Sequence, residues 1–467
     1  MVFSSISFLY YFLPVFLGLY FIVPKKFKNC VLLLASLVFY FYGERIYCLV
    51  MLLSIVSGYM HGLWIDKKRN TPYGRLALIS SIVSSVGVLF FFKYTDFFIE
   101  NINYIFSGRI SPLKIALPIG ISFYTFQIMS YTIDVYRNKA GVQKNIFNFA
   151  TYVALFPQLI AGPIVRYTTV EKELECRTHT LEKTAHGIWR FVIGLSKKVI
   201  FANALGELCK IISRSKEQSV LFYWMTAFAF VLQVYYDFSG YSDMAIGLGK
   251  IFGFHFPENF NYPYISKSIA EFWRRWHISL GTWFRDYVYI PMGGNRVGVA
   301  KWIRNIVVVW FLTGFWHGAQ WNFILWGLLF ALLLVIERLF LKKILEKLPA
   351  LIRHVYVLFC IIISFTLFNA DSLGEAAKNL SGMFGFLDVA LSNPETVYYA
   401  RSYALLFLFA MIGATPIPVK IINKIAAGKR GKSFINLNKP VVIVLLLLVV
   451  TGYLIDGSFN PFLYFRF

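Results

Sequence analysis

Residues 307–318 read Val-Val-Val-Trp-Phe-Leu-Thr-Gly-Phe-Trp-His-Gly, an apolar stretch with one ionisable side chain, His317. The segment from Val307 to Leu334 otherwise has the composition of a membrane-spanning helix. An ionisable group at membrane depth costs roughly 2.5–3.5 kcal/mol on insertion scales, so it usually faces a cavity and has a function. Imidazole also titrates near neutral pH, which suits proton transfer. His317 is therefore a candidate catalytic residue, and the alternative is a histidine that only hydrogen-bonds a neighbouring helix.

The composition is that of a membrane protein. The chain has 467 residues, of which 58% are hydrophobic and 15% are charged, whereas soluble domains have about 25% charged residues. The net charge of +23 comes from short basic clusters between apolar runs, and no nucleic-acid-binding module accompanies it. We therefore expect the lipid bilayer, and no nucleic acid, as a partner. The cysteines and histidines show no metal-ligand spacing, so we expect no disulfide framework and no catalytic metal.

Apolar runs recur along the whole chain and predict an all-α polytopic membrane protein with about 11–12 transmembrane helices. The runs are Ile6–Val23, Cys30–Tyr42, Tyr47–Trp64, Leu76–Phe92, Ile115–Ile133, Ile188–Leu205, Val220–Val234, Ile303–Phe315, Asn322–Ile336, Val355–Phe368, Tyr403–Ile417 and Val441–Leu454. No basic residue precedes the first run and no small-residue cleavage site follows it. We expect a retained span there and not a cleaved signal peptide.

Charge clusters orient these spans. Basic clusters follow the runs that end at Val23, Trp64 and Ile336, and another precedes the last run. The loop from Asp371 to Glu395 is instead acidic. Because basic loops stay in the cytoplasm, this pattern predicts that both termini are extracytoplasmic.

The middle of the chain, from Asn148 to Arg304, departs from this simple pattern. Charged, glycine and proline residues break its apolar runs, as in Phe156–Pro163 and Asn259–Pro263. Non-helical backbone at membrane depth is tolerated only where protein or a water-filled cavity surrounds it. We therefore expect re-entrant segments that line a central cavity, within a single integral membrane domain that comprises residues 1–467.

The densest group of polar and aromatic motifs lies between Tyr235 and Arg296. It reads Tyr-Tyr-Asp-Phe-Ser-Gly-Tyr-Ser-Asp at 235–243, Pro-Glu-Asn-Phe-Asn-Tyr-Pro-Tyr at 257–264, Glu-Phe-Trp-Arg-Arg-Trp-His-Ile-Ser-Leu at 271–280, Trp-Phe-Arg-Asp-Tyr at 283–287 and Pro-Met-Gly-Gly-Asn-Arg at 291–296. Further motifs are Met-Val-Phe-Ser-Ser at 1–5, Gly-Ile-Ser-Phe-Tyr-Thr-Phe at 120–126, Trp-His-Gly at 316–318 and Phe-Leu-Tyr-Phe-Arg-Phe at 462–467. With these motifs the whole chain resembles the membrane-bound O-acyltransferase (MBOAT) superfamily, specifically its bacterial alginate O-acetyltransferase-type branch.

The resemblance implies a many-helix fold pierced by a tunnel between the two faces of the membrane. It also implies an acyl thioester donor and a hydroxyl acceptor. By resemblance, His317 is the essential histidine of the superfamily, and a neutral imidazole can take a proton from an attacking hydroxyl. His277 is the second histidine that matches the family pattern. It either assists the chemistry, orients the donor, or only hydrogen-bonds the re-entrant segment.

Several charged residues near His277 are further candidates. Guanidinium groups suit bidentate contacts with the phosphates of coenzyme A, and the arginines concerned are Arg274, Arg275, Arg285 and Arg296. Their alternative role is ordinary anchoring at the cytoplasmic face. Asp237 and Asp243 stand in apolar context and are candidate partners for a histidine or an arginine, because a buried charge needs such a partner. For Asp237 the alternative that we favour is an arginine pair that only satisfies the fold.

Residues 460–467 form an aromatic tail that contains Tyr464. The tail is either an interfacial anchor, a normal use of aromatic side chains, or it folds back into the outer mouth of the tunnel. In the second case Tyr464 accepts the acyl group, because tyrosine is a covalent nucleophile when a base such as His317 activates it.

The predicted function is that of a membrane O-acetyltransferase in the bacterial inner membrane. It moves acetyl from cytoplasmic acetyl-CoA, a substrate and not a permanent cofactor, to an exported cell-envelope polysaccharide or exopolysaccharide. Because the chain has no soluble domain to hold a polymer, we expect an extracytoplasmic partner of the SGNH-hydrolase type. The alternatives are D-alanyl or lipid acyl transfer by the same fold, a non-enzymatic transporter that tolerates replacement of His317, and a scaffold for a polysaccharide synthase.

Overall fold

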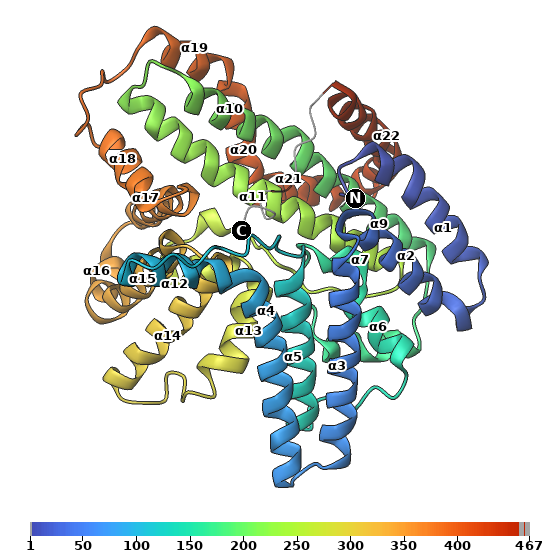
Figure 1. The fold of residues 1–467 in the computed structure, drawn as a ribbon. Helices are drawn as coiled ribbons and strands as arrows, with labels where there is room; N and C mark the ends of the chain where they lie inside the picture. Colours follow the sequence, from blue (N-terminus) through green and yellow to red (C-terminus); the bar gives the residue numbers. More distant parts are fainter. Residues whose placement is uncertain (1, 457–461, 463–467) are drawn as a thin grey trace. The chain divides into compact units, whose positions relative to one another are not determined.

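The computed structural model of the chain describes residues 2–456 and Phe462, and no strand occurs among these residues (Figure 1). The prediction of an all-α protein is therefore confirmed. The helices form two compact units, each built from two stretches of the chain. The prediction that residues 1–467 form one domain stays a prediction.

Unit 1 comprises Met1–Phe191 and Tyr241–Glu258. Its helices are α1 (Leu13–Ile22), α2 (Lys28–Glu44), α3 (Tyr47–Lys67), α4 (Pro72–Phe106), α5 (Ile121–Tyr136), α6 (Ile146–Ala154), α7 (Phe156–Leu159), α8 (Tyr167–Glu175) and most of α9 (Leu181–Ser196). The helices α3, α4 and α5 lie side by side (Figure 1). All residues from Ile121 to Val135 are buried, which makes α5 the core of this unit.

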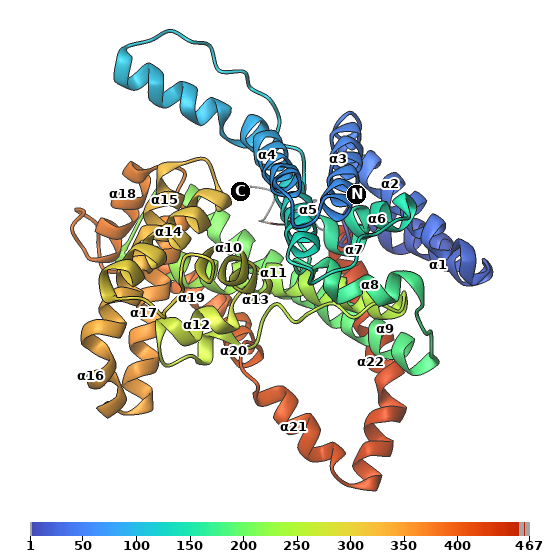
Figure 2. The ribbon, with the colours of Figure 1, turned by 90° about the horizontal axis from the view of Figure 1, so that it is seen from below.

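Unit 2 comprises Val192–Gly240 and Asn259–Phe467. Its helices are α10 (Asn203–Arg214), α12 (Ile269–Arg275), α13 (Ile278–Phe284), α14 (Val299–His317), α15 (Trp321–Ile336), α16 (Lys342–Lys347), α17 (Ala350–Asn369), α18 (Leu373–Met383), α19 (Pro394–Ser402), α20 (Ala404–Gly413), α21 (Ile417–Ala426) and α22 (Lys429–Asp456). The long helix α11 (Val220–Ile251) begins in unit 2 and ends in unit 1. The helices α21 and α22 pair as a hairpin that carries the last basic cluster of the sequence (Figure 2).

In the described part of the chain, seven helical segments are long and apolar enough to cross a membrane, or up to eight if the bent pair α19–α20 is one span. They are Lys25–Glu44, Tyr47–Lys67, Pro72–Phe106, Val220–Ile251, Trp321–Lys347, Ala350–Asn369 and Lys429–Asp456. The polytopic class is thus confirmed, with fewer such helices than the apolar runs predict. Several runs form shorter helices: α5, for example, has 16 residues, which at 1.5 Å per residue gives about 24 Å against a hydrocarbon core of about 30 Å.

Glycine contacts between α14 and α15 fix the end of α14. A Cβ at Gly314 would lie 2.3 Å from the carbonyl oxygen of Phe323, and a Cβ at Gly327 would lie 2.3 Å from that of Trp310. Small residues of this kind let helices in membranes approach closely. Because His317 is the last residue of α14, this packing sets its position against α15.

Candidate functional site

His317 stands in an aromatic enclosure within unit 2. Its ring centroid lies 5.0 Å from that of Trp316, 5.1 Å from that of Trp326 and 5.4 Å from that of Phe368, with the rings edge to face. Trp326 belongs to α15 and Phe368 to α17, so three helices enclose the imidazole. Apolar walls of this kind limit access of water to the imidazole, which strengthens its electrostatic interactions.

His277 is buried in the segment between α12 and α13. Its backbone is left-handed, with φ 44° and ψ 52°, a conformation that costs a residue other than glycine about 1–2 kcal/mol. Such strained residues cluster at functional sites, where the surrounding structure holds them. The carboxylate of Glu337 supports this segment, because its oxygens accept hydrogen bonds from the backbone N–H groups of Ile269 and Ala270 at the start of α12 (2.7 and 3.2 Å).

The side chain of Asn259 selects the tautomer of His277. The Asn259 Oδ1 atom accepts hydrogen bonds from the backbone N–H and the hydroxyl of Ser279 (3.2 and 2.8 Å), so it is an acceptor. The His277 Nδ1 atom lies 3.1 Å from the same oxygen and must therefore donate its hydrogen. In the neutral ring, Nε2 then carries the lone pair. This atom is buried and has no hydrogen-bond partner among the described residues.

Burial also keeps His277 neutral. Desolvation lowers the pKa of His277 to about 3, because a buried site disfavours the charged imidazolium. His277 therefore presents an unprotonated Nε2 at neutral pH, which is the form that accepts a hydrogen bond or a proton.

The structure brings the two predicted histidines into one cluster. The indole ring of Trp316 contacts both, with centroid separations of 6.2 Å to His277 and 5.0 Å to His317. Phe238 of α11 covers another side of His277, at a ring separation of 4.7 Å. One aromatic ring thus joins the two candidate catalytic groups, although they are 40 positions apart in the sequence.

A cavity of about 580 Å³ in unit 2 includes His277 in its wall, together with Arg274, Arg285 and Arg338; we call it the arginine cavity. Arg274 is exposed and forms no hydrogen bond with a described residue. Arg285 pairs with Asp286 at 2.7 Å, and the Arg338 guanidinium lies 4.1 Å from the centre of the Trp302 ring. The arrangement offers cationic groups and a neutral imidazole to one ligand.

The predicted arginines divide into two groups. Arg274 and Arg285 line the arginine cavity, whereas Arg275 and Arg296 are not among its lining residues. Arg275 pairs with Glu271 at 2.9 Å and donates a hydrogen bond to the carbonyl of Asn261. Arg338 was missed in the sequence because it follows an apolar run like any interfacial anchor. Its contribution depends on the packing of α12 to α15 around the cavity.

The buried aspartates have cationic partners, each within one unit. Asp237 pairs with the buried Lys198 in unit 2, and Asp243 pairs with Arg190 in unit 1 at 2.6 Å. Buried charges need such partners, and these two ion pairs supply them.

Tyr464 lies outside the described residues. Phe462 is described and buried, and the ammonium of Lys198 lies 4.6 Å from the centre of its ring. Lys198 pairs with Asp237, the residue before Phe238. Phe462 is therefore linked through this ion pair to the segment of α11 that covers His277.

Comparison with known proteins identifies the family of the chain. Residues 32–346 match the sequence model of the MBOAT, membrane-bound O-acyltransferase family. The chain is 38% identical to a probable alginate O-acetylase of Azotobacter vinelandii over 499 residues, which covers all of both chains. It is 33% identical to a peptidoglycan O-acetyltransferase of Helicobacter pylori over 515 residues, covering 100% of this chain and 98% of that relative. A teichoic acid D-alanyltransferase of Bacillus subtilis is 29% identical over 304 residues, covering 62% of this chain and 73% of the relative.

The chain belongs to the membrane-bound O-acyltransferase family. It is a multi-pass membrane protein and an acyltransferase, which confirms the predicted class and activity.

Proposed function

We propose that this acyltransferase transfers acetyl from cytoplasmic acetyl-CoA to a hydroxyl acceptor, for O-acetylation of an exported polysaccharide. The observation that carries the proposal is the arginine cavity, whose wall contains cationic groups and the neutral His277, in ring contact with Trp316 beside His317. The full-length similarity to an alginate O-acetylase and a peptidoglycan O-acetyltransferase supports a polysaccharide acceptor.

Arg274, Arg285 and Arg338 are proposed to bind the phosphates of the donor. Guanidinium groups form charge-assisted, often bidentate, hydrogen bonds with phosphate oxygens. His277 is proposed to orient the acyl end of the donor by accepting a hydrogen bond at Nε2. We propose Arg275 and Arg296, which do not line the cavity, as anchors at the cytoplasmic face.

His317 is proposed as the general base. It takes the proton of the attacking hydroxyl while the hydroxyl oxygen bonds to the acetyl carbonyl carbon. The carbon–sulfur bond then breaks, and the coenzyme A thiolate leaves and receives that proton from the imidazolium. No metal or redox group takes part in these steps, and the atoms and charges balance.

Tyr464 is proposed as the first acceptor in the same reaction. The position of Phe462, two residues earlier, supports this, because it is buried beside Lys198 and Asp237. The acetyl ester on Tyr464 would then pass to the polymer through an extracytoplasmic SGNH-hydrolase-type partner. This requires extracytoplasmic termini in the inner membrane, as the charge pattern predicts.

The test uses the purified full-length protein in nanodiscs with radiolabelled acetyl-CoA. We expect release of free CoA and label on Tyr464 in peptide mass spectrometry, both lost in His317→Ala. Free CoA without labelled protein would retain the acetyltransferase and make the tail an anchor. Absence of CoA release, even with partner and polymer added, would contradict the proposal. Turnover of a D-alanyl carrier thioester or of long-chain acyl-CoA instead would favour the corresponding transfer, and flux without thioester cleavage would favour a transporter.

A further inference from the structure

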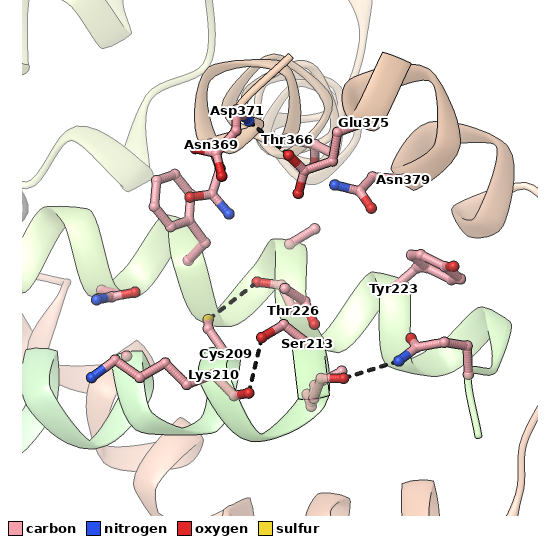
Figure 3. Close-up of a pocket in the computed structure, with 16 residues that line it drawn as sticks. Cys209, Lys210, Ser213, Tyr223, Thr226, Thr366, Asn369, Asp371, Glu375 and Asn379 are labelled. Atoms are coloured by element: carbon pink, nitrogen blue, oxygen red, sulfur yellow. Dashed lines mark hydrogen bonds between the residues drawn. The ribbon is translucent and has the colours of Figure 1, made fainter. Parts of the chain in front are cut away.

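A second cavity of unit 2 lies between α10, α11, α17 and α18 (Figure 3). Its volume is about 330 Å³, which falls in the range of small-molecule sites, roughly 300–1,000 Å³. Four side-chain amides line it, those of Gln218, Gln233, Asn369 and Asn379; we call it the amide cavity. Figure 3 shows Asn369, Glu375 and Asn379 on one wall and Lys210, Ser213 and Thr226 on the opposite wall.

Gln233 is the residue that suggests a ligand. Its side chain lines the cavity at 9% exposure, and it forms no hydrogen bond with any described residue. Gln218 differs, because its amide donates hydrogen bonds to the carbonyls of Ile212 and Ser215 (3.0 and 2.9 Å). Asn379 resembles Gln233 in forming no hydrogen bond with the described part of the chain. Buried amides are normally paired, so the unpaired amide of Gln233 is available for a ligand, and so is that of the half-buried Asn379.

The charges of the cavity favour a neutral ligand. Two carboxylates, Asp371 and Glu375, line it with one ammonium, that of Lys210. Lys210 itself lies 3.6 Å from Glu207. The surplus of negative charge repels anions. Amides donate and accept hydrogen bonds, and so do the hydroxyl groups of a sugar.

One wall of the amide cavity belongs to α17, the helix whose Phe368 contacts the candidate catalytic histidine. Asn369 follows Phe368, whose ring centroid is 5.4 Å from that of His317. The lining residue Asp371 begins the acidic loop, which the positive-inside rule assigns to the extracytoplasmic face. A ligand would thus enter this cavity from the side opposite to the basic loops, where the extracytoplasmic partner is proposed to act.

We propose that the amide cavity binds a neutral, polyhydroxylated segment of the saccharide acceptor and holds it for the transfer from Tyr464, which the extracytoplasmic partner completes. This rests on the proposed function, and it narrows the acceptor to an uncharged saccharide as opposed to a uronate polymer. Gln233 and Asn379 hydrogen-bond the sugar hydroxyls.

The experiment measures binding of neutral chitotetraose and of an anionic tetrauronate to the full-length protein in nanodiscs by saturation-transfer NMR, without acetyl-CoA. We expect chitotetraose to bind more tightly than the tetrauronate, and Gln233→Leu and Asn379→Ala each to weaken it at least tenfold. Asn438→Ala, an amide of α22 outside both cavities, is the matched control and leaves binding unchanged. Monodisperse elution and an unchanged melting temperature show that each variant is folded.

The proposal would be overturned if both folded variants bound chitotetraose as tightly as the unaltered protein does. It would also be overturned if the unaltered protein bound the tetrauronate more tightly than chitotetraose. Binding of a partner-protein peptide that displaces no saccharide and depends on Gln233 would also overturn it. If Gln233→Leu does not fold, Asn379→Ala alone decides, because Asn379 lies on the shorter helix α18. Since this assay contains no donor, its outcome is independent of CoA release, which tests the proposed function separately.

Discussion

The arginine cavity and the amide cavity lie in the same unit of the protein and differ in the kind of polar groups that line them. The arginine cavity takes its polarity from guanidinium groups and a neutral imidazole. The amide cavity takes it from uncharged amides with a surplus of carboxylates. Both adjoin the aromatic cluster around His317, through Trp316 beside His277 on one side and through Phe368 on the other. One helical unit therefore contains two cavities of opposite electrostatic preference, as the proposed anionic donor and the proposed neutral acceptor require.

Replacement of His317, the proposed general base, is expected to have the largest effect on activity. We expect His317→Ala to lower acetyl transfer by about a thousandfold, since a positioned general base contributes 10²–10⁴-fold. The measurement is the rate of CoA release and of polymer acetylation at equal protein level. The matched control is His186→Ala, which removes an exposed histidine of α9. Retained activity in His317→Ala would reduce His317 to a structural residue.

Removal of cationic groups from one cavity should affect the donor alone. We expect the double variant Arg274→Ala/Arg338→Ala to raise KM for acetyl-CoA by about 100-fold or more, because each of the two charge-assisted hydrogen bonds contributes about 1.5–3 kcal/mol. Arg296→Ala, outside the cavity, is the control and changes KM little. If the control raised KM as much as the double variant does, these arginines would act only through the net charge of the cytoplasmic face.

The tautomer of His277 can be tested through pH. In Asn259→Asp, a carboxylate faces Nδ1 and raises the pKa of His277 from about 3 by about 1–3 units. Because the protonated ring has no lone pair at Nε2, activity should be lost as the pH falls through the raised pKa and return above it. At pH 5 we expect a loss of up to about tenfold. The control is Ser279→Ala, which adds no charge and should leave the pH at which activity is lost unchanged. If that pH were also unchanged in Asn259→Asp, His277 would have no part in the mechanism.

Salt provides the mildest test of the difference between the cavities. Raising the ionic strength from about 0.01 to 0.15 M shortens the Debye length from about 30 to 8 Å. KM for acetyl-CoA should therefore rise a few-fold, whereas chitotetraose binding should stay constant. Parallel salt dependence of both ligands would show that the two cavities do not differ electrostatically.

The candidate site was only partly predictable from the sequence. His317 and His277 were recognisable because an ionisable residue among apolar ones, and a motif that matches a family, are local properties. Arg338 and Asn259 carry no such local signal: one resembles an interfacial anchor and the other a turn residue. Their roles depend on contacts with residues far along the chain, such as the three hydrogen bonds that Asn259 Oδ1 accepts from His277 and Ser279.

Hydropathy, charge clusters and motifs need no knowledge of neighbours in space, so the amino-acid sequence alone was enough to predict the all-α membrane class, the family and the two histidines as candidate site residues. Among the described residues, fewer helices are long and apolar enough to span than there are apolar runs. An apolar run records burial and not whether protein or lipid surrounds it, and the buried helix α5 is the example. The tertiary structure was needed to show which arginines share a cavity, which nitrogen of His277 carries its lone pair, and that the amide cavity shares helix α17 with the aromatic wall around His317. These properties follow from packing between helices distant in sequence, where glycines at positions 314 and 327 and the caps of short helices set the distances.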